Sequence, residues 1–574
     1  MFVRTRLVTT GTLAVLLLAA RPAAAAWSAN GNLACNAAGD QSNTLLVSDG
    51  SGGMFLIWQD DRSGTSDLYA LRLTGNGVVS PGWPANGYAV CTAGGDQKLA
   101  VAAADGAGGF YLAWEDYRVP GGESDVYLQR VTGFATVAAG WPADGLPVCA
   151  LAHSQGYPTL IADGTGAIVA WQDDRDGVST DLYAQRINGA AAVQWAAGGV
   201  AICTAVGNQF FPSMVSDGAG GAFLAWQDAR DGDPDVYAQR VNAAGAPQWS
   251  ANGVPVCNAL YEQLTPRMVP DGSGGVLVEW DDYRDLNSDV YAQRLNGSGV
   301  RQWATQGVAL CNDLSEQYSS SFVTDGAGGG IVTWTDYRGL EGDLYAQRVN
   351  GSGTPQWLAN GLVICNATGD QFDATAVPDL ANGMYLVWSD ARGGPGSADI
   401  FAKRVTSSGG TANGWQATGS LVCNAPDAQM RPAVLGDGAG CFVAWSDERG
   451  GVGTPDIYAW RAGGSSSVDV PSAPVVTALD FAPPFPNPAH GGSRGPGVTL
   501  RFQTAEITPA RMTVFDLAGR RVRALLDDSN LAPGWHTVRW DLKEDSGSPA
   551  PAGLYLITLQ TTAGPQVRKL TVVR

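Results

Sequence analysis

The chain has 574 residues, of which 45% are hydrophobic and only 16% are charged. This composition excludes an intrinsically disordered protein, and the length exceeds one ordinary hydrophobic core, so a repeat array or several domains is expected. The formal net charge of −19 argues against binding to nucleic acid or to an anionic membrane, and no Lys/Arg cluster reverses this locally.

The first 26 residues have the pattern of a secretory signal peptide. Arg4 and Arg6 precede an apolar run from Leu7 to Ala20, and small residues end near Ala26. The run is too short to span a bilayer comfortably, and no other segment is apolar enough to do so. We therefore expect a mature chain without a transmembrane segment that is secreted or held at the cell surface.

Three sequence marks recur at intervals of 54 to 58 residues from residue 27 onward. They are a W-x-D-x-R word, a second word that runs from Trp to Cys, and a Gln six residues after each of those cysteines. A fixed period of this length indicates a solenoid, a propeller or another array. The W-x-D-x-R words begin at Trp58, Trp114, Trp171, Trp226, Trp280, Trp334, Trp388 and Trp445, and the glutamines are Gln41, Gln97, Gln155, Gln209, Gln263, Gln317, Gln371 and Gln429.

Each repeat contains four short β-strand patterns and no helical period. In the unit at 209–258 the strands are expected near 211–216, 220–228, 235–241 and 254–257. Glycine-rich and Asn-containing turns separate them. Four strands per unit match a propeller blade.

The two ends of the array are each incomplete. The mature chain begins with a fourth strand, Trp27 to Cys35, and the last unit ends after a third strand near Arg461. Each end supplies what the other lacks, whereas an open array would leave two bare sheet edges. The predicted fold is therefore all-β: a closed eight-bladed β-propeller of four-stranded blades at 27–463, in which the N-terminal strand completes the last blade.

The repeated residues are interpreted as scaffold, because a binding site needs a unique constellation and a scaffold needs a repeated one. The tryptophans are expected to fill the wedges between blades. The Asp and Arg of W-x-D-x-R are expected to hydrogen-bond around their loop to the third strand. The glutamines should satisfy backbone groups where one blade leads into the next. The nine cysteines, eight of them at equivalent positions, are expected to be buried free thiols.

A different pattern follows a Ser/Pro-rich linker at 464–477. It contains FPNPA at 485–489, then D-x-x-G-R, G-x-H-x-V-x-W-D and G-x-Y in alternating strand-like segments. Residues 478–574 resemble the C-terminal domains of exported bacterial proteins, either type IX secretion sorting domains or flagellar-hook-capping Ig-like domains. The resemblance implies a small Ig-like β-sandwich that sorts or anchors the chain and contacts secretion machinery.

The turns between third and fourth strands resemble those of sialidase and Asp-box propellers. NAAGAPQW at 242–249 and NGSGTPQW at 350–357 match the Gly and Trp of that family's S-x-D-x-G-x-x-W turn but lack its Asp. The resemblance concerns turn design and implies a propeller. A sialidase would also need three arginines with a Tyr–Glu pair and an acid, and no such unique set can be picked out.

Candidate ligand residues lie in the loops between second and third strands, which vary in sequence on an otherwise uniform scaffold. Tyr117, Tyr283 and Tyr337 could stack on a sugar or could cap their own loops. Asp231, Asp233 and Asp235 offer three carboxylates for Ca²⁺, without the longer loop of an EF-hand. No other cofactor is expected, and no catalytic residue is identified.

Three hypotheses for function remain open. The first is a non-catalytic, exported propeller that binds glycan or protein through its loop face. The second is a structural envelope or matrix component that self-associates. The third is a carbohydrate-active hydrolase or lyase, which would need two acids from different blades roughly 5–10 Å apart. The sequence names neither the ligand nor the oligomeric state.

Overall fold

The computed structural model describes residues 27–462 except 120, 340, 395 and 452, and 480–481, 489–490, 498–504, 508–516, 519–531, 534–562 and 564–573. The expected signal peptide at 1–26, the linker at 464–477 and residues 485–488 of FPNPA lie outside these ranges. Two compact units are formed, Met1–Val470 and Pro471–Arg574. The described residues contain strands and no helix, so none of them forms a helix that could cross a membrane.

The first unit contains eight four-stranded antiparallel sheets, or blades. The first strands are β2 (Gln41–Ser48), β6 (Gln97–Ala104), β10 (Gln155–Ala162), β14 (Gln209–Ser216), β18 (Gln263–Pro270), β22 (Gln317–Thr324), β26 (Gln371–Pro378) and β30 (Gln429–Gly436). The second strands are β3 (Met54–Asp60), β7 (Phe110–Asp116), β11 (Gly166–Asp173), β15 (Ala222–Asp228), β19 (Val276–Asp282), β23 (Gly330–Asp336), β27 (Met384–Asp390) and β31 (Cys441–Asp447).

The outer half of each blade completes this pattern. The third strands are β4 (Asp67–Leu73), β8 (Asp125–Val131), β12 (Asp181–Asn188), β16 (Asp235–Val241), β20 (Asp289–Leu295), β24 (Asp343–Val349), β28 (Asp399–Val405) and β32 (Asp456–Ala462). The fourth strands are β5 (Tyr88–Cys91), β9 (Leu146–Cys149), β13 (Val200–Cys203), β17 (Val254–Cys257), β21 (Val308–Cys311), β25 (Leu362–Cys365), β29 (Ser420–Cys423) and β1 (Asn32–Cys35).

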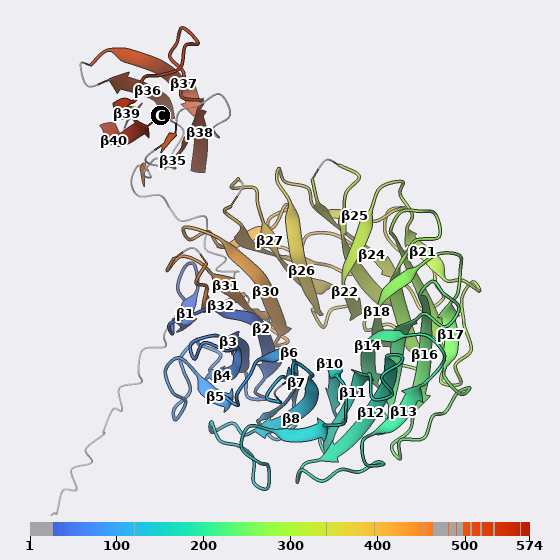
Figure 1. Ribbon diagram of the computed structural model, residues 1–574. Coiled ribbons are helices and arrows are strands. Elements are labelled where there is room, and N and C mark those ends of the chain that lie inside the picture. The colour runs from blue at the N-terminus through green and yellow to red at the C-terminus, as the bar shows by residue number, and fades with distance from the viewer. Residues whose placement is uncertain are drawn as a thin grey trace, which may run out of the picture. The chain divides into compact units, whose positions relative to one another are not determined.

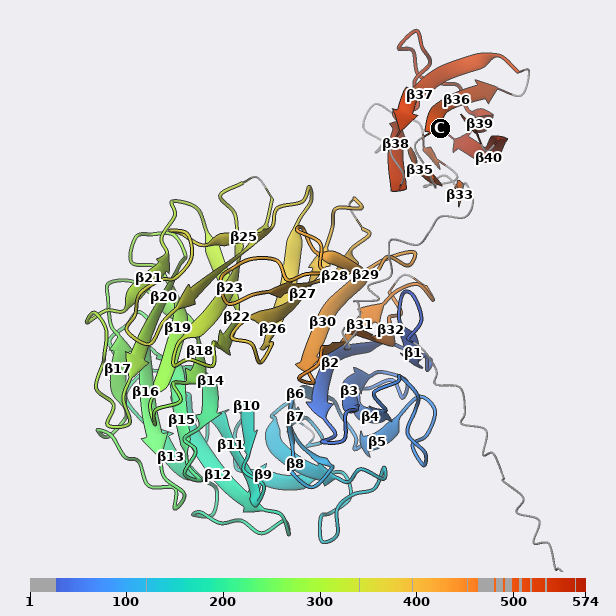
Figure 2. The same ribbon diagram turned by 180° about the vertical axis from the view of Figure 1, so that it is seen from behind.

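The eighth blade joins the two ends of the array. Its strand order is β30-β31-β32-β1, and Leu33 of β1 pairs with Tyr458 of β32. A hydrogen bond from the amide of Gln41 to the carbonyl of Pro455 also links the first blade to the eighth. In Figures 1 and 2 the blades surround a common axis, with the first strands innermost. The N-terminal strand therefore removes the bare edge of β32.

Burial changes from strand to strand within a blade. The second strand β15 is buried along its whole length, whereas the innermost strand β14 is mostly half-buried. A second strand lies between two strands of its own blade and between two neighbouring blades, which explains its continuous apolar run. The core is correspondingly shared between blades: Val236 of β16 and Trp280 of β19 belong to one buried cluster.

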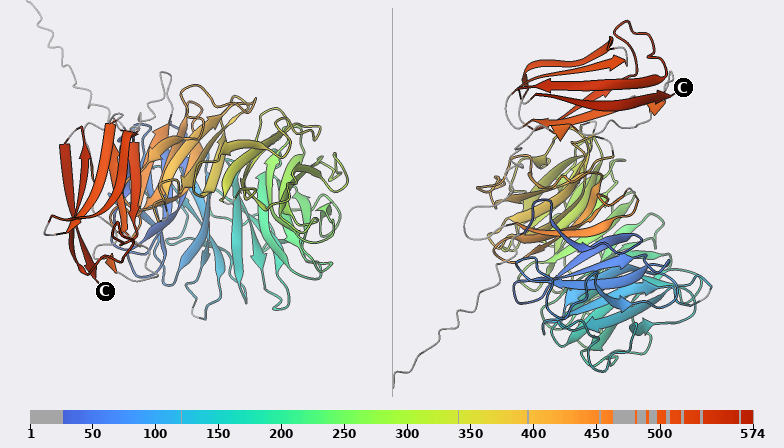
Figure 3. Two further views of the ribbon diagram at one scale, coloured as in Figure 1. Left: turned by 90° about the horizontal axis from the view of Figure 1, so that it is seen from above. Right: turned by 90° about the vertical axis from the view of Figure 1, so that its left-hand side faces the viewer.

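The two faces of the array carry different connections. Consecutive antiparallel strands turn at alternate ends, and Figure 3 shows strands of the array running between its two faces. One face carries the second-to-third-strand loops and the segments that lead from one blade into the next; we call it the crossover face. The opposite face carries the D-G-x-G-G and third-to-fourth-strand turns. There Arg72 binds Asp49 of its own blade and the carbonyl of Gly133 in the next.

All nine cysteines are buried and free. Burial raises the pKa of the Cys91 thiol to about 12 and that of Cys441 to about 12. A thiol that stays protonated is a poor nucleophile and a poor metal ligand. The cysteines therefore behave as small apolar residues of the blade interior.

The second unit has a three-stranded and a five-stranded sheet. The first contains β33 (Asp480–Phe481), β35 (Val498–Thr504) and β38 (Gly534–Trp540), and the second contains β34 (Ala489–His490), β36 (Thr508–Asp516), β37 (Arg521–Leu531), β39 (Gly553–Thr561) and β40 (Gly564–Val573). One hydrophobic cluster includes residues of both sheets, such as Phe502 and Ile557. Between β36 and β37, Asp516 of the D-x-x-G-R motif accepts the amide of Arg520, and Gly519 has a φ of 78°.

Candidate ligand-binding site

The W-x-D-x-R residues form the same closed network in every blade. In the first blade the indole Nε1 of Trp58 donates to Asp60 at 2.8 Å, and Arg62 Nε donates to the same carboxylate at 2.7 Å. The guanidinium of Arg62 lies 3.9 Å from the centre of the Tyr69 ring. Arg62 also donates to the carbonyl of Asn86. The expected hydrogen bond to the third strand is thus replaced by a cation–π contact, and the hydrogen bond goes to the segment before the fourth strand.

The repeated glutamines hold the crossovers between blades. Gln41 Nε2 donates to the carbonyls of Ala37 and Gly39, at 3.2 and 2.8 Å. Gln209 makes the equivalent pair of bonds to Ala205 and Gly207. The repeated Trp, Asp, Arg and Gln side chains therefore bind one another and the backbone rather than facing a common site.

One position in each first strand behaves differently. In seven of the eight first strands, the pairing with the second strand slips by a β-bulge that begins two residues after the repeated Gln. In β22 the slip comes one residue later, after Ser319, which still pairs with Trp334. Bulges redirect side chains and are frequent beside functional sites. We call the eight residues at this position, two after each repeated Gln, the bulge ring: Asn43, Leu99, Tyr157, Phe211, Thr265, Ser319, Asp373 and Arg431.

The backbone of the bulge ring is unfavourable for the residues that occupy it. Seven of the eight residues, all except Ser319, have φ between 48° and 53°. Glycine adopts this left-handed region freely, while other residues cost about 1–3 kcal/mol, with Asn and Asp tolerated best. No glycine occurs in the ring, and its eight residues are all different. A strained position that keeps a side chain on an otherwise uniform scaffold marks a candidate functional site.

All residues of the bulge ring except the buried Ser319 line two adjoining hollows at the axis. One has a volume of about 490 Å³ and includes Asn43, Leu99, Asp373 and Arg431 in its wall. The other, of about 470 Å³, includes Leu99, Tyr157, Phe211 and Thr265. They share Leu99 and Ala100. We call the two together the axial pocket.

Three of these positions are held by the residue between Trp and Asp of W-x-D-x-R in the preceding blade. Glu115 accepts the amide of Tyr157 at 3.0 Å, and Gln172 accepts the amide of Phe211 at 2.7 Å. Asp281 likewise accepts the amide of Ser319 at 2.8 Å. This position in the repeated word, unlike Trp, Asp and Arg, therefore supports the axial pocket.

A buried polar cluster without counterpart in the other blades lies at the wall of the axial pocket. Glu279 is fully buried, pairs through Oε1 with Arg267 at 3.1 Å and leaves Oε2 without a hydrogen bond. Burial raises the pKa of Glu279 to about 7, and burial also raises the pKa of Asp281. Arg267 donates to Ser319 Oγ at 2.6 Å, and Thr265 donates to Asp281 at 2.7 Å. The two carboxyls belong to one strand and are buried, so they are not the acids from different blades that a hydrolase would need.

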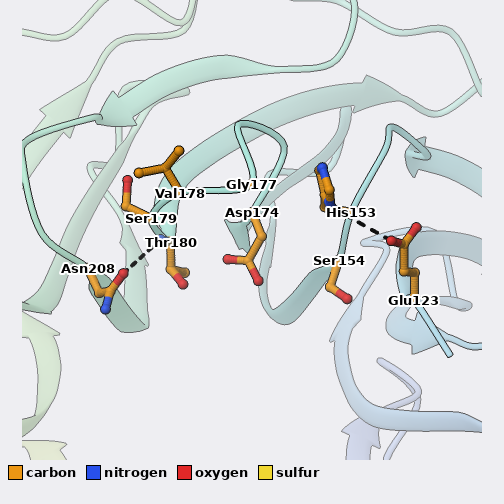
Figure 4. A pocket seen from close by; sticks show the side chains of 9 residues that line it. All are labelled: Glu123, His153, Ser154, Asp174, Gly177, Val178, Ser179, Thr180 and Asn208. Atoms are coloured by element: carbon orange, nitrogen blue, oxygen red, sulfur yellow. Dashed lines mark hydrogen bonds and ion pairs between the residues drawn. The ribbon is translucent and has the colours of Figure 1, made fainter.

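A second, more polar hollow lies between loops of the crossover face (Figure 4). It has a volume of about 310 Å³ and is lined by residues that include Glu123, His153, Asp174 and Asn208. His153 is half exposed, and its Nδ1 lies 3.7 Å from Glu123 Oε1. The residues that line the hollow include no Phe, Tyr or Trp, and its histidine is an exposed loop residue.

The three predicted ligand tyrosines do not share one site. Tyr117 donates to Glu115 at 3.2 Å, which fits a loop-capping role. Tyr337 is 42% exposed and packs edge-on against Tyr318 at 6.0 Å. Burial, together with Glu316 and Tyr283, raises the pKa of Tyr318 to about 12. Tyr283 and Tyr337 thus both neighbour Tyr318, which the sequence did not single out.

The predicted calcium ligands differ in their environments. Asp231 and Asp233 are exposed, whereas Asp235 is buried at the start of β16, opposite Asp228. Every third strand begins with Asp at this place, so Asp235 belongs to the repeat. Among the described residues no group of three His, Cys, Asp or Glu side chains is placed to hold a metal ion. Calcium binding here stays a prediction, which a calcium-dependent rise in Tm would test.

Comparison with known proteins gives only distant similarities. No family model and no curated protein matches the sequence. PorZ, a surface component of the type-IX secretion system of Porphyromonas gingivalis, is 10% identical, with 93% of this chain and 75% of that chain covered and a TM-score of 0.25. A Hadza microbial sialidase is 12% identical, covering 59% and 73%, with a TM-score of 0.30. An exo-β-1,3-galactanase from Phanerochaete chrysosporium is 10% identical, covering 76% and 98%, with a TM-score of 0.28.

Scores this low carry no argument about activity. The assignment of a β-propeller architecture rests on the eight four-stranded sheets themselves.

Proposed function

We propose that the chain is an exported, non-catalytic β-propeller that is secreted or surface-held and binds a glycan at its axial pocket. The observation that carries this proposal is the bulge ring. It consists of eight different residues, seven of them exposed, at one equivalent position of a uniform scaffold. Rigid elements that present variable side chains in a concave pocket are the usual arrangement of a binding site.

The remaining parts of the chain are assigned supporting roles in this proposal. Residues 1–26 direct export, and the N-terminal strand closes the propeller through its pairing with β32. The second unit is an Ig-like sandwich that engages secretion machinery and anchors or sorts the chain. The resemblance of residues 478–574 to such domains supports this role.

A glycan array with the full chain tests the proposal, in calcium and with chelator. Saturable binding to a defined sugar is expected, and it should weaken when Arg431 and Asp373 of the bulge ring are changed to Ala. An array without binding, for a chain that retains its cooperative unfolding, would contradict glycan binding. Concentration-dependent self-association in that case would instead support the structural-component hypothesis.

A further inference from the structure

We propose that Tyr157 and Phe211 form a stacking platform for the apolar face of a neutral pyranose, with Arg267 and Thr265 beside it as hydrogen-bonding partners for the sugar hydroxyls. This inference rests on the proposed glycan-binding function and names the ligand class and the part of the axial pocket that recognises it.

The platform is an exposed aromatic surface inside a pocket. Tyr157 and Phe211 are 43% and 45% exposed, and their rings meet edge to face with centroids 5.1 Å apart. Leu99, which is 44% exposed, lines the same hollow. The hollow's volume of about 470 Å³ lies in the roughly 300–1,000 Å³ range of small-molecule sites. Contiguous exposed apolar groups of this kind usually mark a contact surface.

The platform is also held rigidly. Glu115 and Gln172 accept the amides of Tyr157 and Phe211. A Cβ at Gly156 would lie 1.8 Å from the Glu115 carboxylate, so only glycine fits before Tyr157. Pro158 and Pro212 directly follow the two aromatic residues and have a fixed φ. Aromatic groups that are already ordered lose little conformational entropy when a ligand stacks on them.

Hydrogen-bonding groups lie at the adjoining wall. Every hydrogen bond that Arg267 donates within the described residues leaves from Nη1, so Nε and Nη2 stay available, and the side chain is 34% exposed. Thr265 uses its hydroxyl hydrogen on Asp281, which leaves its oxygen as an acceptor. A pyranose has an apolar C–H face and peripheral hydroxyls, which matches an aromatic surface bordered by polar groups.

The charges of this wall favour a neutral sugar over an acidic one. Glu279 and Asp281 lie next to Arg267 and offset its charge. The whole chain carries a formal charge of −19. A carboxylate or sulfate on the ligand would therefore be repelled by the protein as a whole and would meet no uncompensated cation at this wall.

The test compares glycine substitutions at two places with the same backbone. Tyr157→Gly and Phe211→Gly remove the platform but suit a positive φ, so each variant should keep or raise the Tm. Tyr261→Gly is the matched control: Tyr261 has a φ of 62° and is 47% exposed, but it does not line the axial pocket. Arg267→Lys keeps a cation beside Glu279 and removes the planar fork.

Calorimetric titration of the full chain uses neutral gluco-, galacto-, manno- and xylo-oligosaccharides, with oligogalacturonate as the acidic probe. We expect a neutral probe to bind and Tyr157→Gly and Phe211→Gly to lower its affinity at least about tenfold. Arg267→Lys should also weaken binding, while Tyr261→Gly should bind as the unsubstituted chain does.

Two results would overturn the platform but leave glycan binding intact: unchanged affinity in both platform variants, or preferential binding of oligogalacturonate. A folded chain that binds none of these probes and no sugar of the array would refute the proposed function together with this inference.

Discussion

The network formed by the Trp, Asp and Arg of W-x-D-x-R, here called the tryptophan network, and the bulge ring lie one strand apart in every blade. They differ in how far their residues vary between blades. The network repeats the same residues eight times and leaves its tryptophans at most 1% exposed. The ring uses eight different residues, most of them exposed. Packing between two blades imposes the same shape on every wedge, so the network must repeat. Seven of the ring side chains are exposed, so they are not confined to a wedge between two blades and their chemistry can differ from blade to blade.

Removal of residues 27–36 should lower the free energy of unfolding most. It removes β1 and its pairing with β32, which joins the two ends of the array that carries both the tryptophan network and the bulge ring. The deletion leaves the edge of β32 unpaired and removes the buried Cys35 from the core. We expect a larger fall in the free energy of unfolding than any single substitution below produces, measured by urea denaturation followed by tryptophan fluorescence. Deletion of ten residues from the linker at 464–477 is the control. An unchanged urea midpoint would mean that the eighth blade does not need β1.

Trp226→Ala should break the network itself. Trp226 is fully buried and donates to Asp228 at 2.7 Å. Loss of its volume and hydrogen bond should cost about 3–5 kcal/mol of unfolding free energy, whereas Phe211→Ala in the ring should change it by no more than about 0.5 kcal/mol. Equal losses at the two positions, measured by the same denaturation, would remove the distinction between scaffold and ring.

The pH dependence of stability should report the buried aspartates that begin the third strands. Burial, and then the neighbouring Asp231 and Asp228, raise the pKa of Asp235 to about 7. A raised carboxyl pKa means that the folded state prefers the protonated form, so this stability is fully present below about pH 4 and is lost as the pH rises through about 7.

Asp235→Asn should therefore flatten the decline in stability between pH 5 and 8. It should stabilise the chain by about 1–2 kcal/mol at pH 8, with part of the effect screened by solvent near the exposed Asp231. Thermal unfolding across this range provides the measurement. Asp231→Asn, at an exposed position, serves as the control and should have a smaller effect. If the Asp235→Asn chain were less stable than its parent at pH 8, the raised pKa of Asp235 would be refuted.

Leu99→Gly should change the free energy of unfolding least, and it should raise this free energy rather than lower it. It relieves a φ of 48°, so the unfolding free energy should rise by about 0.5–1 kcal/mol after the greater entropy of unfolded glycine is subtracted. Leu45→Gly, two residues beyond the ring and at an ordinary φ, should lower it instead. Destabilisation by both substitutions would show that the ring is packed rather than strained.

Much of the scaffold was predictable because its signals are local. The strand positions, the eight sheets and the incomplete ends followed from the spacing of Trp, Cys and Gln, and the structure has the corresponding four-stranded sheets. The loop tyrosines were predicted as ligand residues because they are aromatic side chains in loops of variable sequence. The bulge ring gave a weaker signal, the one position after each repeated Gln that differs in all eight units. The ring was identified as a candidate site by the positive φ of seven of its residues, which the sequence does not predict.

By itself, the sequence determined the structure of a blade, because each Trp–Asp–Arg network joins residues close together in the chain to one facing strand. The period of the repeats also indicated the number of blades. Only the tertiary structure decided which residues meet at the axis. Tyr157 and Phe211 are 54 positions apart, and Glu279 reaches Ser319 through Arg267 across two blades. Such contacts depend on the angle between neighbouring blades, which the packing of the whole array sets and no single repeat contains.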